Sequence, residues 1–299
     1  MLEQDPRNYQ ILFLSLFLIL GIGTRDWTLR PDLILVLMVT CLLTQYIAVC
    51  IFQNPQEKLL VLTTKENYSQ NSSSKSASYS KLSSLKSALI TALGLTLLLR
   101  ADRYSTMILA GSLAILSKFL FRVDGKHFFN PANFGIVAAL VLTPDAWVSP
   151  GQWGDDGWYA LLFAGTGGMV LKRVGRWDTT AAFLGSYALL EAIRNLWLGW
   201  TWDVFCHRLM SGSLLLFALF MVTDPRSIPN ARISRILWAG CIAVLTFILR
   251  NQFFISTGVF WALFALAPLS ILLDYLWSAP RFSWSFDSGE QQLKNTTNN

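Results

Sequence analysis

Residues 126–135 read Lys-His-Phe-Phe-Asn-Pro-Ala-Asn-Phe-Gly, and this mixture of charged, amide and aromatic groups separates two apolar segments. The Asn130-Pro131 step interrupts a helix, because proline lacks an N–H group and disfavours the α conformation in the residue before it. The apolar run that follows, from Phe134 to Leu142, is about half of the ~20 residues that span a bilayer. A short, interrupted apolar segment indicates a binding site in a membrane protein. The alternative is a loop followed by an ordinary helix that starts at Pro131.

Composition places the chain among polytopic membrane proteins. Of its 299 residues, 53% are hydrophobic and 14% are charged, whereas a soluble domain carries about 25% charged residues. The net charge of +6 does not indicate a nucleic-acid partner, because the Lys and Arg residues lie in short loops between apolar runs. We therefore expect an all-α fold in the lipid bilayer, since no alternating pattern of a barrel is visible.

Ten segments are apolar enough to form helices. They are approximately Tyr9–Ile22, Pro31–Phe52, Ser83–Leu99, Ser105–Phe121, Pro131–Leu142, Gly157–Leu171, Thr179–Trp200, Phe205–Val222, Ile233–Leu249 and Phe253–Trp277. If they alternate in direction from a cytoplasmic N-terminus, most Lys and Arg residues lie in cytoplasmic loops, as the positive-inside rule requires. The sequence thus predicts a single transmembrane domain, residues 1–280, with about ten helices, both termini in the cytoplasm and no strands.

Two polar segments are expected to lie outside the packed helices. Residues 66–84 are rich in Ser and Asn, a composition that cannot build a core, and we expect a mobile cytoplasmic loop there. Residues 281–299 are similarly polar and are expected to form a loose cytoplasmic tail.

The first interruption carries three candidate ligand-binding residues. Asn130 and Asn133 would flank the first turn of a helix that begins at Pro131, where free N–H groups and the positive end of the dipole favour an anion or a polar ring. His127 precedes them, either as a hydrogen-bonded structural group or as a functional one. The alternative for Asn130 is a simple N-cap with nothing bound.

The second interruption, residues 223–230, reads Thr-Asp-Pro-Arg-Ser-Ile-Pro-Asn. Asp224 can cap a turn before Pro225, and Arg226 offers a cation two residues later. The alternative is a helix stop followed by a positively charged loop. Because both interruptions lie on the cytoplasmic side of the predicted topology, we predict that Asp224 and Arg226 share a binding site with the three residues of the first interruption.

The sequence provides no comparable support for a catalytic or metal site. The acids of the predicted loops, Asp145, Asp155, Asp156 and Asp178, have no second ligand at metal spacing, so neither a catalytic group nor a metal is expected. Arg208 lies near the end of an apolar segment, where we expect its side chain to extend to the membrane surface.

Three stretches resemble a known family: His127–Asn133, Leu171–Trp177 and, most specifically, Met210–Pro229. They are similar to the RnfD subunit of Rnf electron-transport complexes and to the NqrB subunit of the sodium-pumping NADH:quinone oxidoreductase, and the resemblance covers roughly residues 85–277. The run from Thr143 to Gly154 resembles a branch of stand-alone membrane proteins encoded in enediyne biosynthesis clusters.

The resemblance implies a ten-helix fold of two related halves in the bacterial inner membrane, associated with electron or ion transport, with other membrane subunits as partners. By this resemblance the chain is expected to be at most a redox subunit, and its sequence has no catalytic motif of its own. Family members carry FMN on the threonine of a Ser-Gly-Ala-Thr motif between the fifth and sixth helices, and the corresponding loop here, Thr143–Gly157, lacks that motif. We therefore expect FMN or riboflavin to be bound non-covalently. The alternative is a stand-alone transporter for a small organic molecule, lined by the same five residues, and a third possibility is a structural membrane partner without a ligand.

Overall fold

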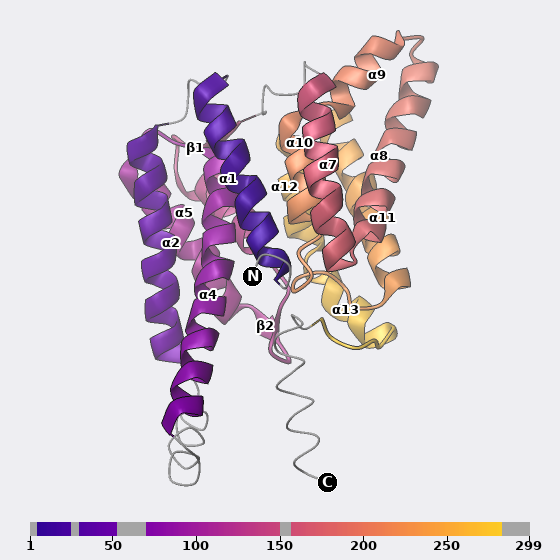
Figure 1. The fold of residues 1–299 in the computed structure, drawn as a ribbon. Coiled ribbons are helices and arrows are strands. Elements are labelled where there is room, and N and C mark those ends of the chain that lie inside the picture. Colours follow the sequence, from indigo (N-terminus) through magenta and orange to yellow (C-terminus); the bar gives the residue numbers. More distant parts are fainter. Residues whose placement is uncertain (1–4, 25–29, 53–69, 150–156, 283–299) are drawn as a thin grey trace.

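The computed structural model describes residues 5–24, 30–52, 70–149 and 157–282, and helices make up most of this part of the chain (Figure 1). The helices run side by side in two groups. The first half contains α1 (Pro6–Thr24), α2 (Pro31–Phe52), α4 (Gln70–Leu98), α5 (Tyr104–Leu120) and α6 (Pro131–Leu142). The second half contains α7 (Gly157–Val174), α8 (Trp177–Trp197), α9 (Trp202–Leu209), α10 (Gly212–Leu216), the π-helical turn η2 (Phe217–Met221), α11 (Arg232–Asn251), α12 (Gly258–Leu266) and α13 (Leu269–Leu276).

Part of the packing order recurs in the two halves. In the first half α2 packs on α5, α5 on α6 and α1 on α4; in the second, α8 packs on α11, α11 on α12, and α7 on α10 and η2. The two halves also meet directly, because α6 packs against α12. This shared order is what a fold of two related halves would produce.

Several helices have the length and composition of membrane spans. Among the described residues, α1, α2 and α11 are long and apolar enough to cross a bilayer, and two bent helix pairs raise the number of candidates to five. Shorter apolar helices are Ser84–Leu98 within α4, α5 and α6. The structure therefore confirms a predominantly helical membrane fold, while the count of ten spans and the cytoplasmic placement of both termini remain predictions.

Two segments predicted as single helices are broken. The chain bends by 51° between α9 and the α10–η2 segment and by 47° between α12 and α13. The second bend occurs at Pro268, which cannot donate the backbone hydrogen bond that a continuous helix needs. The first lies at Met210 and Ser211, immediately before Gly212.

The prediction that the chain has no strands is wrong in the connections between helices. Strand β1 (Leu99–Arg100) pairs with β4 (Trp147–Val148), and β2 (Arg122–Val123) pairs with β3 (Lys126–His127). Asp124 and Gly125 join β2 to β3 with positive φ angles of 51° and 79°, the backbone of a tight hairpin turn that Asp-Gly sequences favour. This hairpin holds His127 directly before α6.

The prediction of a mobile loop at residues 66–84 is wrong for most of this range, because α4 begins at Gln70. The polar residues continue the helix that the apolar segment Ser84–Leu98 forms, and extending an existing helix costs much less than starting one. Residues 66–69 and the tail from 283 onward lie outside the described residues.

A contact from a distant loop completes the start of α5. The N-cap residue Arg103 makes no capping bond with its own side chain. Instead Asp145 Oδ2 accepts the backbone N–H groups of Asp102 at 3.1 Å and of Arg103 at 3.0 Å, and Asp145 Oδ1 accepts the hydroxyl of Thr106 at 2.7 Å. Asp145 thus acts as a helix cap, which satisfies donors that are otherwise free.

Candidate functional site

A pocket lies between the two halves of the molecule, and its empty space of about 950 Å³ includes the part that is open to solvent. Helices α1 and α4 and the start of α6 line it from the first half, and α7, α10, η2 and the loop after η2 line it from the second. Four of the five predicted ligand-binding residues are among its lining residues, namely His127, Asn130, Asp224 and Arg226. The structure thus brings the two polar interruptions together at one cavity.

Asn130 anchors the start of α6 beside the cavity. Its Oδ1 accepts the backbone N–H of Asn133 at 3.0 Å, which is the N-cap arrangement proposed from the sequence. Its Nδ2 donates to the carbonyl oxygen of Met221 at 3.1 Å, at the end of η2. Asn130 therefore joins the first half to the second while it caps α6.

Asn133 does not line the cavity. Its side chain is 1% exposed, and Nδ2 donates to the carbonyl oxygen of Phe260 in α12 at 3.1 Å. Its Oδ1 finds no hydrogen-bond partner within the described parts of the chain. The structure therefore places the side chain of Asn133 in the interface between α6 and α12, outside the cavity that the other four residues line.

His127 and Asp224 form one of the contacts between the two interruptions. Nε2 of His127 lies 3.8 Å from Oδ2 of Asp224, and Asp224 Oδ1 accepts the backbone N–H of Arg226 at 3.2 Å. Burial lowers the pKa of His127 more than the neighbouring carboxylate raises it. Burial alone would raise the pKa of Asp224, but its hydrogen bonds and the nearby cations hold it below the usual value. The lowered pKa of each group favours a neutral imidazole and an ionised carboxylate.

Two further cations near the cavity were not predicted from the sequence. Lys118, in the last turn of α5, is 5% exposed, and its Nζ contacts the carbonyl and hydroxyl oxygens of Ser87, both at 3.3 Å. Ser87 in turn lines the cavity. Arg7 in α1 also lines it and is paired with Asp5 at 3.0 Å. Both cations resemble ordinary charges at the ends of helices, and only the packing of α1, α4 and α5 buries them.

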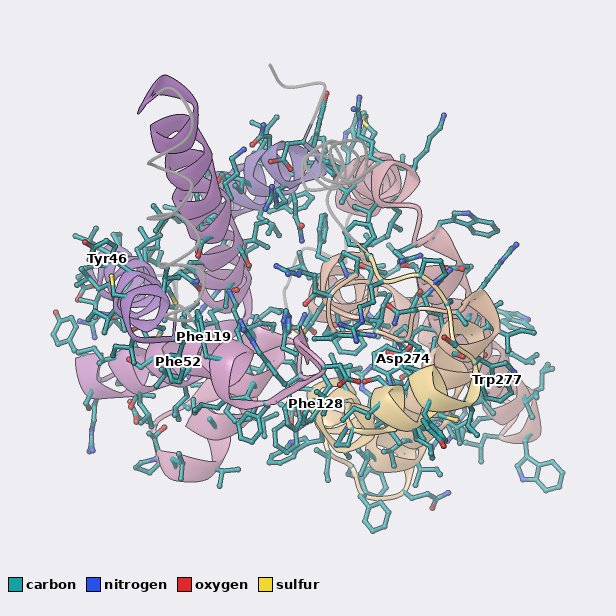
Figure 2. The ribbon with its side chains drawn as sticks, turned by 90° about the horizontal axis from the view of Figure 1, so that it is seen from below. Tyr46, Phe52, Phe119, Phe128, Asp274 and Trp277 are labelled. Carbon is teal, nitrogen blue, oxygen red and sulfur yellow. The ribbon has the colours of Figure 1, made fainter. Side chains whose placement is uncertain are left out.

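Lys126, the first residue of the interruption at residues 126–135, connects this segment to α13 and to the second interruption. Its Nζ lies 2.5 Å from Oδ2 of Asp274 in α13 and 2.6 Å from the carbonyl oxygen of Ile228. The other oxygen of Asp274 accepts the backbone N–H of Asn230 at 2.7 Å. In the view from below, Phe128 lies between the two groups of helices, with Asp274 beside the second (Figure 2). These contacts join β3, the second interruption and α13 next to the cavity.

A separate polar cluster joins α8, α9 and α11. Glu191, which is 2% exposed, accepts Nη1 of Arg208 at 3.1 Å and Nδ2 of Asn251 at 2.8 Å, and the same Nη1 donates to Asn251 Oδ1 at 2.6 Å. Arg208 is thus held by a buried carboxylate while its side chain stays 32% exposed, and its extension to the membrane surface remains a prediction.

Asp178, expected in a loop, lies in the first turn of α8 and pairs with Arg235 of α11 at 2.5 Å. Its partner also donates to the carbonyl oxygen of Asn230 at 2.5 Å. Within the described residues, no group of three or more His, Cys, Asp or Glu side chains is arranged to hold a metal ion.

Comparisons with known proteins agree with the resemblance drawn from the motifs. Residues 149–282 match the model of the NQR2, RnfD, RnfE family, which covers helices α7 to α13 and the second interruption.

Among curated proteins, the chain is similar to the RnfD-type subunit of the ion-translocating oxidoreductase complex from three bacteria. The protein of Vibrio vulnificus strain YJ016 is 32% identical over 126 residues, which is 42% of this chain and 35% of the relative. That of Actinobacillus pleuropneumoniae serotype 5b is 29% identical over 98 residues, 32% of this chain and 28% of the relative.

The third, from Pseudomonas paraeruginosa, is 28% identical over 254 residues, 65% of this chain and 74% of the relative. The chain thus spans about a third of the length of the first two relatives and about three quarters of the third. Together these matches confirm the resemblance of this chain to the RnfD/NqrB family of membrane subunits.

Proposed function

We propose that this protein is a membrane subunit of the RnfD/NqrB type, associated with electron or ion transport, that binds a flavin non-covalently in the cavity between its two halves. The observation that carries the proposal is the meeting of His127, Asn130, Asp224 and Arg226 at one cavity.

The lining of the cavity suits an aromatic ligand with a polar edge. Leucine, isoleucine, valine and phenylalanine side chains from α1, α4, α7 and η2 form apolar walls, and polar groups lie at the two interruptions and on α1 and α4. A flavin ring has an apolar body and a pyrimidine edge that both donates and accepts hydrogen bonds. The neutral imidazole of His127 can donate or accept, and Asp224 can accept, so the two residues fit that edge.

When bound, the flavin would supply the redox chemistry, and the protein would bind, orient and shield it. The polar residues at the interruptions would orient the ring, and the apolar walls would exclude water. Partner subunits, a bacterial inner-membrane location, ten spans and cytoplasmic termini belong to the same proposal, supported by the names of the relatives and by the charge of the loops.

The first test is the visible spectrum of the full-length protein purified in a mild detergent. We expect a flavin absorption band that disappears on reduction with dithionite, and a pigment that separates from the chain after denaturation. Asp224→Ala should lower the affinity for the pigment by about tenfold or more, because a hydrogen bond to a charged group is lost. Asp203→Ala, at an exposed position in α9, is the control and should retain the pigment. A colourless, folded preparation that also takes up no added flavin would refute the proposal.

A second candidate function is transport of a small organic molecule. The position of the cavity between two halves that share part of their packing order favours it, since transporters built from repeats place their site at the interface of the repeats. In that case the purified protein in liposomes would move the molecule across the bilayer, and Asp224→Ala would stop the movement. Retention of a redox-active flavin without any transport would exclude this alternative.

A further inference from the structure

A group of arginines lies where α8 and α11 begin. The two helices pack side by side (Figure 1), and Asp178 in the first turn of α8 joins them through Arg235 of α11. Oδ2 of Asp178 accepts Nη2 of Arg235 at 2.5 Å, and Oδ1 accepts Nε of Arg235 at 3.3 Å and the backbone N–H of Thr179 at 2.9 Å. Both oxygens of this carboxylate are therefore already in use.

Arg232, the first residue of α11, has no close partner for its charge. Its Nε lies 3.7 Å from Oδ2 of Asp178, which is longer than a hydrogen bond. Its guanidinium lies over the ring of Trp177, 5.6 Å from the ring centre, and its side chain is 67% exposed. Within the described part of the chain, the two Nη groups of Arg232 make no hydrogen bond. Trp177 thus holds a guanidinium with free donors at the surface.

Arg176 adds a third positive charge beside Trp177. It directly precedes Trp177 in the chain and is the N-cap residue of α8. Its Nε is buried without a hydrogen-bond partner among the described residues, and its guanidinium lies over the ring of Phe282, 5.3 Å from the ring centre. Within the described ranges Arg176 forms no ion pair, so three arginines share the carboxylate of Asp178. The starts of α8 and α11 therefore carry an excess of positive charge.

This excess charge lies at the end of an apolar helix face. Helix α11 is long and apolar enough to cross a bilayer. After Arg232 its exposed side chains are Ile233, Ile236, Leu237, Cys241, Val244 and Ile248. This face exposes none of the glycine, hydroxyl or amide groups that join helices in a membrane, so it suits the acyl chains of lipids. Trp177 is 56% exposed, and tryptophan prefers the level of the lipid headgroups.

We propose that Arg232, Trp177 and Arg176 bind the headgroup of an anionic phospholipid whose acyl chains lie along α11. The phosphodiester accepts hydrogen bonds from the free Nη groups of Arg232, and Arg176 adds attraction for its negative charge. The lipid supplies the negative charge that Asp178 alone does not provide. None of these residues lines the cavity, so the lipid site is independent of the ligand proposed there.

The test compares phosphatidylglycerol with phosphatidylcholine, added in equal amounts to the full-length protein in a neutral detergent. We expect phosphatidylglycerol to raise the melting temperature more, and native mass spectrometry to show at least about fivefold tighter binding of it, the contribution of one cation near a lipid surface. Arg232→Gln should remove this preference, and Arg232→Lys should keep part of it, because the charge remains without the planar fork. Equal binding of the two lipids, or an unchanged preference in Arg232→Gln, would overturn the proposal.

Arg281→Gln is the matched control. The side chain of Arg281 is 58% exposed, but its guanidinium already contacts Asp124, so the preference for phosphatidylglycerol should not change. A loss of preference in this variant as large as in Arg232→Gln would indicate a general effect of net charge and would refute the site.

Two measurements keep the result independent of folding. The contact of Arg232 with Asp178 is long, and its guanidinium is exposed, so Arg232→Gln without lipid should melt within about 2 °C of the wild type. Trp177→Leu keeps an apolar side chain but removes the ring that holds the guanidinium, and the preference should fall about threefold. A full preference in Trp177→Leu would overturn the proposed geometry.

Glycerol 3-phosphate separates a lipid from a soluble phosphate ester. It carries a phosphate group without acyl chains, and we expect it to leave the melting temperature unchanged at the concentration at which phosphatidylglycerol acts. If it stabilises the protein as strongly, and through Arg232, the ligand is a soluble ester and the lipid is overturned. Size-exclusion chromatography tests a protein on the same face. If Arg232→Gln or Trp177→Leu changes the oligomeric state, the face is an interface between proteins and the lipid proposal fails.

Discussion

Arg208→Met tests the buried polar cluster of Glu191, Arg208 and Asn251 most directly. The substitution removes the cationic partner of Glu191, which is 2% exposed, and leaves it beside the amide of Asn251 and the hydroxyl of Tyr187. Removing one partner of a buried ion pair costs about 3–5 kcal/mol. Because the 2.8 Å bond from Asn251 survives, we expect a loss near the lower end, about 3 kcal/mol.

Substitution of the acidic partner should lower the free energy of unfolding by less. In Glu191→Gln the guanidinium of Arg208 remains partly hydrated, since its side chain is 32% exposed, and it still faces the ring of Trp200 at 5.3 Å. We expect a loss of about 1–2 kcal/mol there. The double variant has no unpaired buried charge, so it should lie only about 1–2 kcal/mol below the wild type. The two single losses should therefore exceed the double loss by about 2 kcal/mol or more.

The assay is reversible unfolding in mixed micelles of mild detergent and dodecyl sulfate, followed by tryptophan fluorescence for the wild type and the three variants. Arg103→Gln, at an exposed position, serves as the control and should change the free energy of unfolding by less than about 0.5 kcal/mol. Additive losses in the double variant, or a loss in Arg208→Met as small as that of the control, would refute the view that Arg208 compensates the charge of Glu191.

Three further predictions concern the packing and charge of the region around α6. Gly135→Ala should lower the free energy of unfolding by about 1–3 kcal/mol, because the new methyl group would lie 2.7 Å from a backbone oxygen of α5. Gly185→Ala, with open space around it, is the control and should be neutral or slightly stabilising in the same detergent titration. Burial lowers the pKa of His127, so the unfolded chain binds this proton more readily, and stability should fall as the pH drops from about 7.5 to about 5.5. His127→Gln should reduce that loss in melting curves recorded across the pH range, and an unchanged pH dependence would contradict the assignment. Lys126→Met should lower the free energy of unfolding by about 1.5–3 kcal/mol in chemical unfolding, because the ion pair with Asp274 is lost. Asp274→Asn should lower it less, because the amide still accepts a hydrogen bond. Equal stability of Lys126→Met and the wild type would contradict the bridging role.

Local sequence predicted the elements around the cavity well where a single residue sets the backbone. Pro131 begins α6 and Asn130 caps it, as the amide and proline chemistry requires. The hairpin before α6 was missed although Asp124-Gly125 is a favoured turn sequence, because each of its strands is only two residues long. The breaks at Met210 and Pro268 were likewise hidden inside long apolar runs.

The grouping of the site residues was partly predictable. His127 and Asp224 stand at two interruptions that the predicted topology places on the same side, and the structure brings them within 3.8 Å. Asn133 departs from the prediction because its position on α6 turns it toward α12, and the apolar sequence of that helix gives no indication of which face meets which neighbour. Lys118 and Arg7 could not be distinguished from other charges at helix ends, since only the packing of three helices covers them.

The sequence by itself determined that the chain is a helical membrane protein, where most helices lie, and that residues 126–135 and 223–230 interrupt the apolar pattern. These are local properties, because hydropathy, proline geometry and capping act over one helix or one turn. Only the tertiary structure decided which polar residues face the cavity, which of the described cations lack a counter-ion, and that Arg208 pairs with the buried Glu191. Helices that are apolar on every side carry no periodic pattern to orient them, so the facing residues depend on contacts between segments far apart in the chain.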